Sequence, residues 1–222
     1  MRRLTLHIMV LLLCLTNVQA QHKPYLLGTD EYRAQIKSAP GKRLVELTKV
    51  IPGIKLDIRY ATANNFMHRV MYKQARAFAR APVAEALKQI EAELNAKGLG
   101  LKIYDAYRPY AVTVDFFKMY PDTNFVANPK YGSRHNRGCA IDLTIIDLKT
   151  GKELNMPTPY DSFSAEAASD HPGTTGEKLQ NRELLKQVMQ AHGFAALRTE
   201  WWHFDLVGYL QYELLDVPFA KL

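Results

Sequence analysis

Three segments carry hydrophobic residues at helical spacing. The first spans residues 81–96, where Pro82 suits a first helical turn and Gly98 suits a stop. Its apolar positions are Val83, Ala86, Leu87, Ile90 and Leu94. The same reasoning predicts helices over residues 109–120 and 177–192.

Four other segments have the pattern of strands. Apolar and polar residues alternate over Ile54–Tyr60, which indicates a strand with one buried face. Leu101–Asp105 and Cys139–Asp147 are predicted as strands, and residues 194–207 as two strands or one bent strand.

Two segments rich in Gly, Pro and polar residues, 128–138 and 150–176, are predicted as loops. A loop as long as the second one is often functional. Because helices and strands do not alternate strictly after residue 139, we expect an α+β fold rather than a doubly wound parallel sheet. The expected architecture is one domain with a mainly antiparallel central sheet flanked by helices.

The N-terminus has the organisation of a secretory signal peptide over residues 1–20. Arg2 and Arg3 precede the apolar run Leu4–Leu15, and Val18-Gln19-Ala20 fits a cleavage site. The alternative is an uncleaved N-terminal anchor. We therefore expect an exported domain over residues 21–222, without a membrane anchor after cleavage, in a compartment such as the periplasm.

The composition is that of a globular protein, with 222 residues, 47% hydrophobic and 23% charged. A formal net charge of +7 would admit a nucleic-acid partner. Removal of the signal peptide lowers that charge to about +5, and the basic residues are dispersed, so we expect no nucleic-acid binding. Cleavage would also remove Cys14, which leaves Cys139 as a buried thiol without a disulfide partner.

Reactive residues with apolar neighbours concentrate in three places. His135 and Asp142 are seven residues apart, and Asp142 interrupts an apolar strand, where a carboxylate is costly unless it is paired or binds a metal. The alternative is that Asp142 caps a strand end or pairs with an arginine. Arg108, before a proline-initiated helix, could project into a cleft or simply pair with Asp105.

The third place is Glu200-Trp201-Trp202-His203, where an aromatic core with a hydrogen-bonded histidine is the simpler reading. Side chains three apart cannot share one face of a regular strand, so a common site for Glu200 and His203 requires a turn or bulge. Two histidines and one carboxylate would make a three-ligand zinc site with an open position, beside a general base and a positive charge. No H-E-x-x-H motif or glycine-rich nucleotide motif is present.

These motifs resemble the D-alanyl-D-alanine metallopeptidases, in particular the VanX-type D-Ala-D-Ala dipeptidases, over about residues 45–219. The similarity rests on S-x-H-x-x-G-x-A-x-D from Ser133, E-W-W-H from Glu200 and Y-R-P from Tyr107, together with segments that begin at Tyr60 and Tyr160. The chain between Arg108 and Ser133 looks shorter than in some members, which puts any lid built from it in question.

The resemblance implies hydrolysis of the D-Ala-D-Ala dipeptide by a zinc-activated water, with one zinc ion per chain. The implied roles are zinc binding by His135, Asp142 and His203, general base catalysis by Glu200, transition-state stabilisation by Arg108, and substrate binding by Asp161, Ser133 and Tyr60. It also implies a closed cavity that rejects longer peptides.

Two other functions stay open. A D,D-carboxypeptidase or peptidoglycan endopeptidase would use the same chemistry. A zinc-containing binding module without catalysis is also possible, although Glu200 and Arg108 argue against it. The sequence predicts neither the oligomeric state nor the stereospecificity.

Overall fold

The computed structural model describes residues 24–222, so the predicted signal peptide lies outside the described residues. A five-stranded central sheet has the order β3-β5-β6-β8-β7. Its strands are β3 (Lys55–Leu56), β5 (Leu99–Asp105), β6 (Ala140–Asp147), β8 (His203–Leu206) and β7 (Phe194–Ala196).

The predicted mixture of helices around one sheet is confirmed, but the sheet itself is mixed. Strand pairs β5–β6, β6–β8 and β7–β8 are antiparallel, whereas β3–β5 is parallel. The parallel pair arises because the chain crosses over through a helix between β3 and β5 and returns in the same direction. The prediction of a mainly antiparallel sheet missed this crossover.

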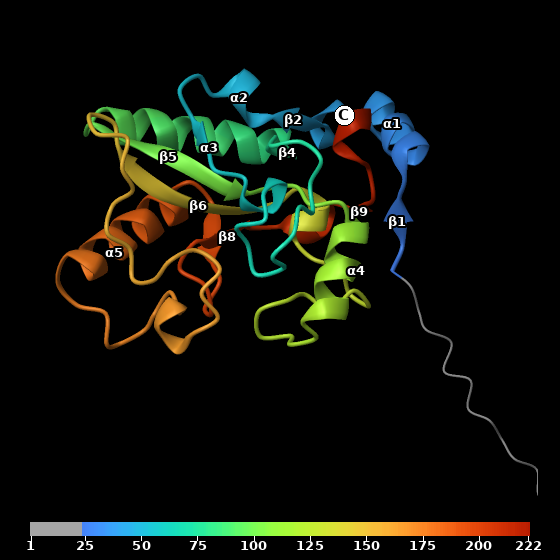
Figure 1. Cartoon of the computed structure of the whole chain (residues 1–222). Coiled ribbons are helices and arrows are strands. Elements are labelled where there is room, and N and C mark those ends of the chain that lie inside the picture. The colour runs from blue at the N-terminus through green and yellow to red at the C-terminus, as the bar shows by residue number, and fades with distance from the viewer. Residues whose placement is uncertain (1–23) are drawn as a thin grey trace, which may run out of the picture.

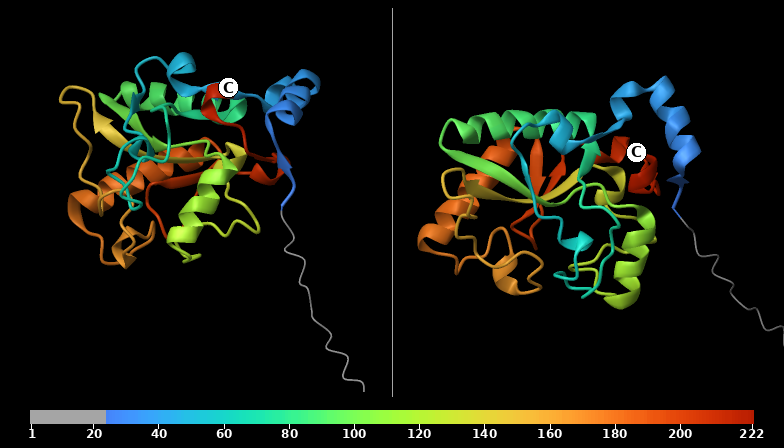
Figure 2. Two further views of the ribbon diagram at one scale, coloured as in Figure 1. Left: turned by 45° about the vertical axis from the view of Figure 1, so that its right-hand side comes forward. Right: turned by 45° about the horizontal axis from the view of Figure 1, so that its top comes forward.

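Helices cover both faces of the sheet. Helix α3 (Ala81–Asn95) lies on one face and α5 (Gly176–Ala191) on the other, as the views in Figures 1 and 2 show. Helix α3 buries the apolar positions that the sequence pattern selected, including Leu87 and Ile90, each with no exposed surface. Helix α4 (Tyr110–Met119) follows β5 and stands beside the loop that leads to β6.

Several short elements were not predicted. They are β1 (Leu26–Leu27), α1 (Thr29–Ser38), β2 (Leu44–Glu46), α2 (Leu47–Val50), β4 (Phe78–Arg80) and β9 (Leu214–Leu215). Strands β1 and β9 form one small parallel sheet, and β2 and β4 form an antiparallel one. Strands of two or three residues are too short to show a period of two.

Arg80 joins three distant segments near the site. Its side chain is completely buried, and it donates hydrogen bonds to the backbone carbonyls of Arg137, Lys42 and Glu213. Buried carbonyls need such partners, so Arg80 fixes the turn that precedes β6.

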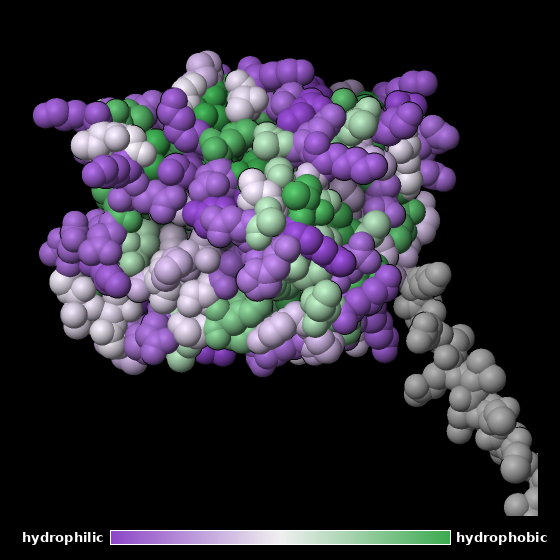
Figure 3. All heavy atoms as spheres, viewed as in Figure 1, coloured by the Kyte–Doolittle hydropathy of each residue, from purple (hydrophilic) through white to green (hydrophobic). Residues whose placement is uncertain are grey.

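The thiol fits the sequence-based expectation. Cys139 is free and buried, and burial raises the pKa of its thiol to about 12. No helix within residues 24–222 combines the length and apolar character needed to cross a membrane. The face in Figure 3 is mostly hydrophilic, with small hydrophobic areas between the polar side chains.

Candidate active site

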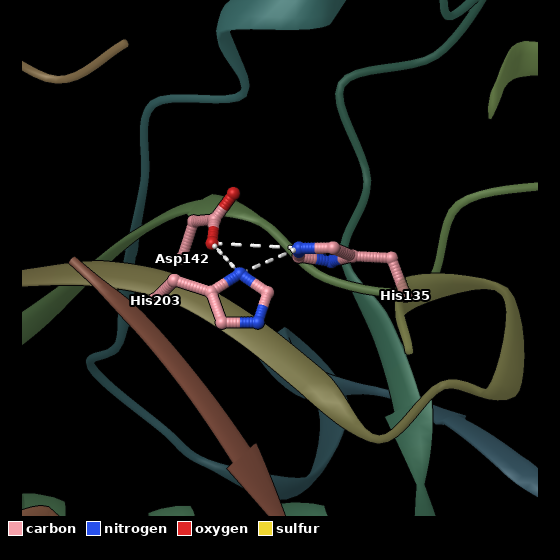
Figure 4. A group of neighbouring side chains, drawn as sticks. All are labelled: His135, Asp142 and His203. Atoms are coloured by element: carbon pink, nitrogen blue, oxygen red, sulfur yellow. Dashed lines mark hydrogen bonds and ion pairs between the residues drawn. The ribbon is translucent and has the colours of Figure 1, made fainter. Parts of the chain in front are cut away.

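Strands β6 and β8 bring two site residues together. Asp142 and His203 lie opposite each other in the antiparallel register of these strands. His135 lies in a 3-10 turn, His135–Arg137, directly before β6. All three side chains are buried, and in Figure 4 they point toward one another.

The three side chains offer atoms at the spacing of a metal site. Oδ1 of Asp142 lies 3.0 Å from Nδ1 of His203 and 3.4 Å from Nε2 of His135, and the two nitrogens are 3.2 Å apart. Ligands about 2.0–2.1 Å from a tetrahedral zinc ion lie ~3.3 Å from one another. Asp142 Oδ1 is buried and has no hydrogen-bond partner among the described residues. These residues therefore fit a zinc ion.

Outer hydrogen bonds orient each of the three groups. Nδ1 of His135 donates to the carbonyl oxygen of Ala106 (2.7 Å), and Nε2 of His203 donates to Oδ1 of Asp205 (2.9 Å). In its neutral form, each imidazole therefore directs a lone pair at the common centre. The hydroxyl of Tyr160 donates to Oδ2 of Asp142 (3.0 Å), which leaves Oδ1 for the centre.

A turn places Glu200 beside the cluster, as a shared site for Glu200 and His203 requires. The N–H of His203 donates to the carbonyl of Glu200, and β8 begins only at His203. Oε2 of Glu200 lies 3.8 Å from Nδ1 of His203. Burial raises the pKa of Glu200 to about 7, which suits a proton acceptor near neutral pH.

Arg108 both pairs with Asp105 and reaches the cavity. Its Nε and Nη2 donate to Oδ2 of Asp105 at 3.0 and 2.7 Å, and the hydroxyl of Tyr72 donates to Oδ1. The guanidinium lies 4.7 Å from the ring centroid of Phe116. The two interpretations of Arg108 are therefore compatible, because Asp105 holds a buried guanidinium that also lines the cavity.

One cavity of about 770 Å³ contains all eight predicted site residues. They are Tyr60, Arg108, Ser133, His135, Asp142, Asp161, Glu200 and His203. Tyr131 (68% exposed) and Leu210 (73% exposed) also line it, so this side opens to solvent. The closed cavity implied by the resemblance is thus open at this rim.

Asp161 is half-buried at another part of the cavity. Its Oδ1 accepts a hydrogen bond from the hydroxyl of Tyr60 (3.0 Å), and its Oδ2 is buried without a hydrogen-bond partner among residues 24–222. Its φ of 61° lies in the left-handed region, which Asp adopts more readily than most residues. Burial and the nearby Asp142 hold the pKa of Asp161 well above its ordinary value, and a cation bound beside Oδ2 would lower that pKa and favour the ionised carboxylate.

Ser133 is held by the turn that carries His135. Its backbone N–H donates to Oδ1 of Asn136 (2.7 Å), and its hydroxyl accepts from the N–H of His135 (3.2 Å). Asn136 also donates to the carbonyl of Arg108 (2.9 Å). Through Asn136, this turn therefore connects Ser133, a predicted substrate-binding residue, to Arg108 just before α4.

Two residues of the site were missed from the sequence. Asp205 is two positions after His203, so it lies on the same face of β8, and that alternation could have identified it. Tyr160 lies in a segment that carried the resemblance, but its bond to Asp142 depends on a contact 18 residues away in sequence, which no local pattern reveals.

The cluster fits the metal site of a metallopeptidase, and sequence comparison specifies the family. Residues 41–220 match the peptidase M15 model described as D-ala-D-ala dipeptidase. The chain belongs to this family, and its cofactor is zinc.

Individual relatives are similar over most of the chain. A D-alanyl-D-alanine dipeptidase of Escherichia coli is 34% identical, covering 80% of this chain and 91% of that protein. A D-alanyl-D-alanine dipeptidase of Enterococcus faecalis is 30% identical, covering 72% of this chain and 90% of that protein. Among solved structures, the LD-carboxypeptidase LdcB matches with a TM-score of 0.42 and 18% identity, over 78% of each chain.

Proposed function

We propose that this chain hydrolyses the D-Ala-D-Ala dipeptide, with His135, Asp142 and His203 as the ligands of one zinc ion. The observation that carries the proposal is one cavity that holds a three-ligand cluster, a carboxylate 3.8 Å from one ligand, and a second carboxylate with a free oxygen. The first carboxylate is Glu200 and the second is Asp161. Family membership supports the same substrate.

Bound zinc would supply a Lewis acid that polarises the peptide carbonyl and acidifies water. Glu200 then takes a proton from the attacking water on a carboxylate oxygen and delivers it to the leaving amine nitrogen. Arg108, held by Asp105, stabilises the negative charge that develops on the carbonyl oxygen, and it needs no reorganisation to do so.

Substrate recognition uses opposite charges at the two ends of the dipeptide. Oδ2 of Asp161 accepts a hydrogen bond from the substrate's ammonium group. The hydroxyl of Tyr60 donates to Oδ1 and holds the carboxylate in place. Ser133, next to the metal ligand His135, binds the carboxyl-terminal side. A dipeptide that spans these groups would place its peptide bond beside the zinc cluster.

The test is hydrolysis by the zinc-loaded full-length protein of D-Ala-D-Ala, L-Ala-L-Ala, an N-blocked D-Ala-D-Ala and a D-Ala-D-Ala-terminated pentapeptide. Fast hydrolysis of the free D,D-dipeptide supports the proposal. Preference for the pentapeptide would instead favour a D,D-carboxypeptidase or peptidoglycan endopeptidase. No hydrolysis by a zinc-loaded protein would favour a binding module.

We also infer that the protein is exported to a periplasm-like compartment. The basic, apolar and cleavage regions of residues 1–20 support this. N-terminal sequencing of the protein from a fractionated cell should find a chain that begins at Gln21, and an intact Met1 in the cytoplasmic fraction would contradict the inference.

A further inference from the structure

One part of the cavity is built from aromatic side chains of three separate segments. Phe163 belongs to the long loop after β6, Phe66 to the loop after β3, and Tyr120 and Phe125 to the end of α4 and the loop beyond it. The centroid of the Phe163 ring lies 5.2 Å from that of Phe66, 4.9 Å from Tyr120 and 4.8 Å from Phe125. We refer to these four residues as the aromatic wall.

Three members of the aromatic wall line the cavity, and Tyr120 supports them from outside it. Phe163 and Phe125 stack with an angle of 20° between their rings. Aromatic rings in such offset contact resist separation more than area burial alone predicts. The stack therefore joins the loop after α4 to the loop after β6 across this part of the cavity.

The aromatic wall adjoins the carboxylate that receives the ammonium. Phe163 is two residues after Asp161, and Phe66 packs on Tyr60, which donates its hydroxyl to Asp161. Asp161 has a positive φ, which persists only where the surroundings hold it. The packing of the Phe163 ring against Phe66, Tyr120 and Phe125 restrains the backbone at Asp161.

We propose that Phe163 and Phe125 limit the substrate at its amino end, so that one additional residue there is rejected. This inference rests on the proposed function. The Oδ2 atom of Asp161 is buried, so its ligand must end close to it, and Phe163 and Phe125 line the same cavity as Asp161. The part of the cavity lined by Tyr131 and Leu210 is instead exposed to solvent.

The experiment compares D-Ala-D-Ala with Gly-D-Ala-D-Ala, using the zinc-loaded full chain. Cleavage of the last bond of the tripeptide forms Gly-D-Ala and D-Ala and reports extension at the amino end. Cleavage of the first bond forms glycine and D-Ala-D-Ala and reports extension at the carboxyl end. Chromatography at low conversion, before either dipeptide product is cleaved further, distinguishes the two reactions.

In the unsubstituted protein, kcat/KM for D-Ala release from the tripeptide should be far below that for the dipeptide. Phe163→Ala and Phe125→Ala should each raise the ratio of tripeptide to dipeptide kcat/KM about tenfold or more, since a pocket that differs by even one methylene can discriminate by that factor. Met119→Ala, at the end of α4 and 57% exposed outside the cavity, is the control and should leave the ratio unchanged.

Zinc content and melting temperature identify a variant that fails to fold. If Phe163→Ala fails to fold, Phe125→Ala by itself tests the inference, because Phe125 is only half-buried on a loop. Two results would overturn this inference but not the proposed function. One is dipeptide hydrolysis by folded Phe variants with an unchanged ratio of tripeptide to dipeptide kcat/KM. The other is an equal kcat/KM for both peptides in the unsubstituted protein. Failure to hydrolyse the dipeptide at all would overturn the proposed function, and the inference with it.

Discussion

His203 and Asp205 lie on the same face of β8, and Nε2 of the imidazole donates to Oδ1 of the carboxylate across 2.9 Å. Asp205 is itself held by Arg134, whose Nη1 lies 3.3 Å from Oδ2. The pair fixes which nitrogen of His203 faces Asp142. The orientation of one metal ligand thus depends on a residue that does not enter the cluster.

Asp205→Ala should therefore weaken zinc binding. Loss of a carboxylate that orients a ligating histidine typically costs about 10–100-fold in metal affinity. Competition with a chromophoric chelator measures the change, and Asp115→Ala, which removes a half-exposed carboxylate on α4, is the control. Equal affinity in both variants would show that His203 is oriented by other contacts.

Glu200→Ala should abolish hydrolysis while about one zinc ion per chain remains bound, because a three-ligand catalytic site does not need the general base to hold its metal. Metal analysis and a dipeptide assay on the same sample measure the two properties. Loss of zinc together with activity would make Glu200 a ligand and contradict its assignment.

Asp161→Asn should lower kcat/KM for the free dipeptide and leave zinc content unchanged. The amide keeps the shape of the side chain and can still accept from Tyr60, but it lacks the charge that pairs with an ammonium. Buried charged hydrogen bonds contribute about 1.5–3 kcal/mol, which corresponds to a loss of more than tenfold. An unchanged kcat/KM would refute ammonium binding at this residue.

Removal of zinc should lower the melting temperature. Without the metal, Asp142 Oδ1 is buried without a hydrogen-bond partner among the described residues, close to ring nitrogens of His203 and His135. A ligand present at 1,000 times its Kd stabilises a fold by about 4 kcal/mol, or roughly 8–16 °C for a domain of this size. Thermal melts with chelator, and again after zinc is restored, measure the shift, and a melting temperature insensitive to chelation would contradict it.

Arg80→Met should destabilise the fold by about 3 kcal/mol or more, because three backbone carbonyls would lose a donor from a completely buried side chain, at about 1–3 kcal/mol each. Arg33→Met on α1, where the side chain is 53% exposed, is the matched control and should change little. Urea unfolding of both variants compares the free energies. A similar stability for the two would mean that water replaces the guanidinium.

The parts of the site that the sequence predicted share one property. Asp142, Glu200 and Arg108 are charged residues among apolar neighbours, and burying such groups is costly without a function or a partner. The structure places all three in one cavity. Their spacing on strands and turns follows local rules, which is why the need for a turn after Glu200 could be stated in advance.

Other features depend on contacts between distant segments, which have no local pattern. The carbonyl of Ala106 that orients His135 is 29 residues away in sequence, and the parallel pairing of β3 with β5 depends on how the intervening chain crosses over. The stack of Phe163 on Phe125 is of the same kind, since neither residue differs locally from an ordinary core aromatic.

The structure near Arg108 depends on residues that the ribosome adds late, in and after β9. Tyr107, the neighbour of Arg108, donates its hydroxyl to the carbonyl of Val217 and accepts from the N–H of the same residue. Leu214 and Leu215 complete a sheet with Leu26 and Leu27. A ribosome must therefore translate past residue 217 before Arg108 acquires its final support.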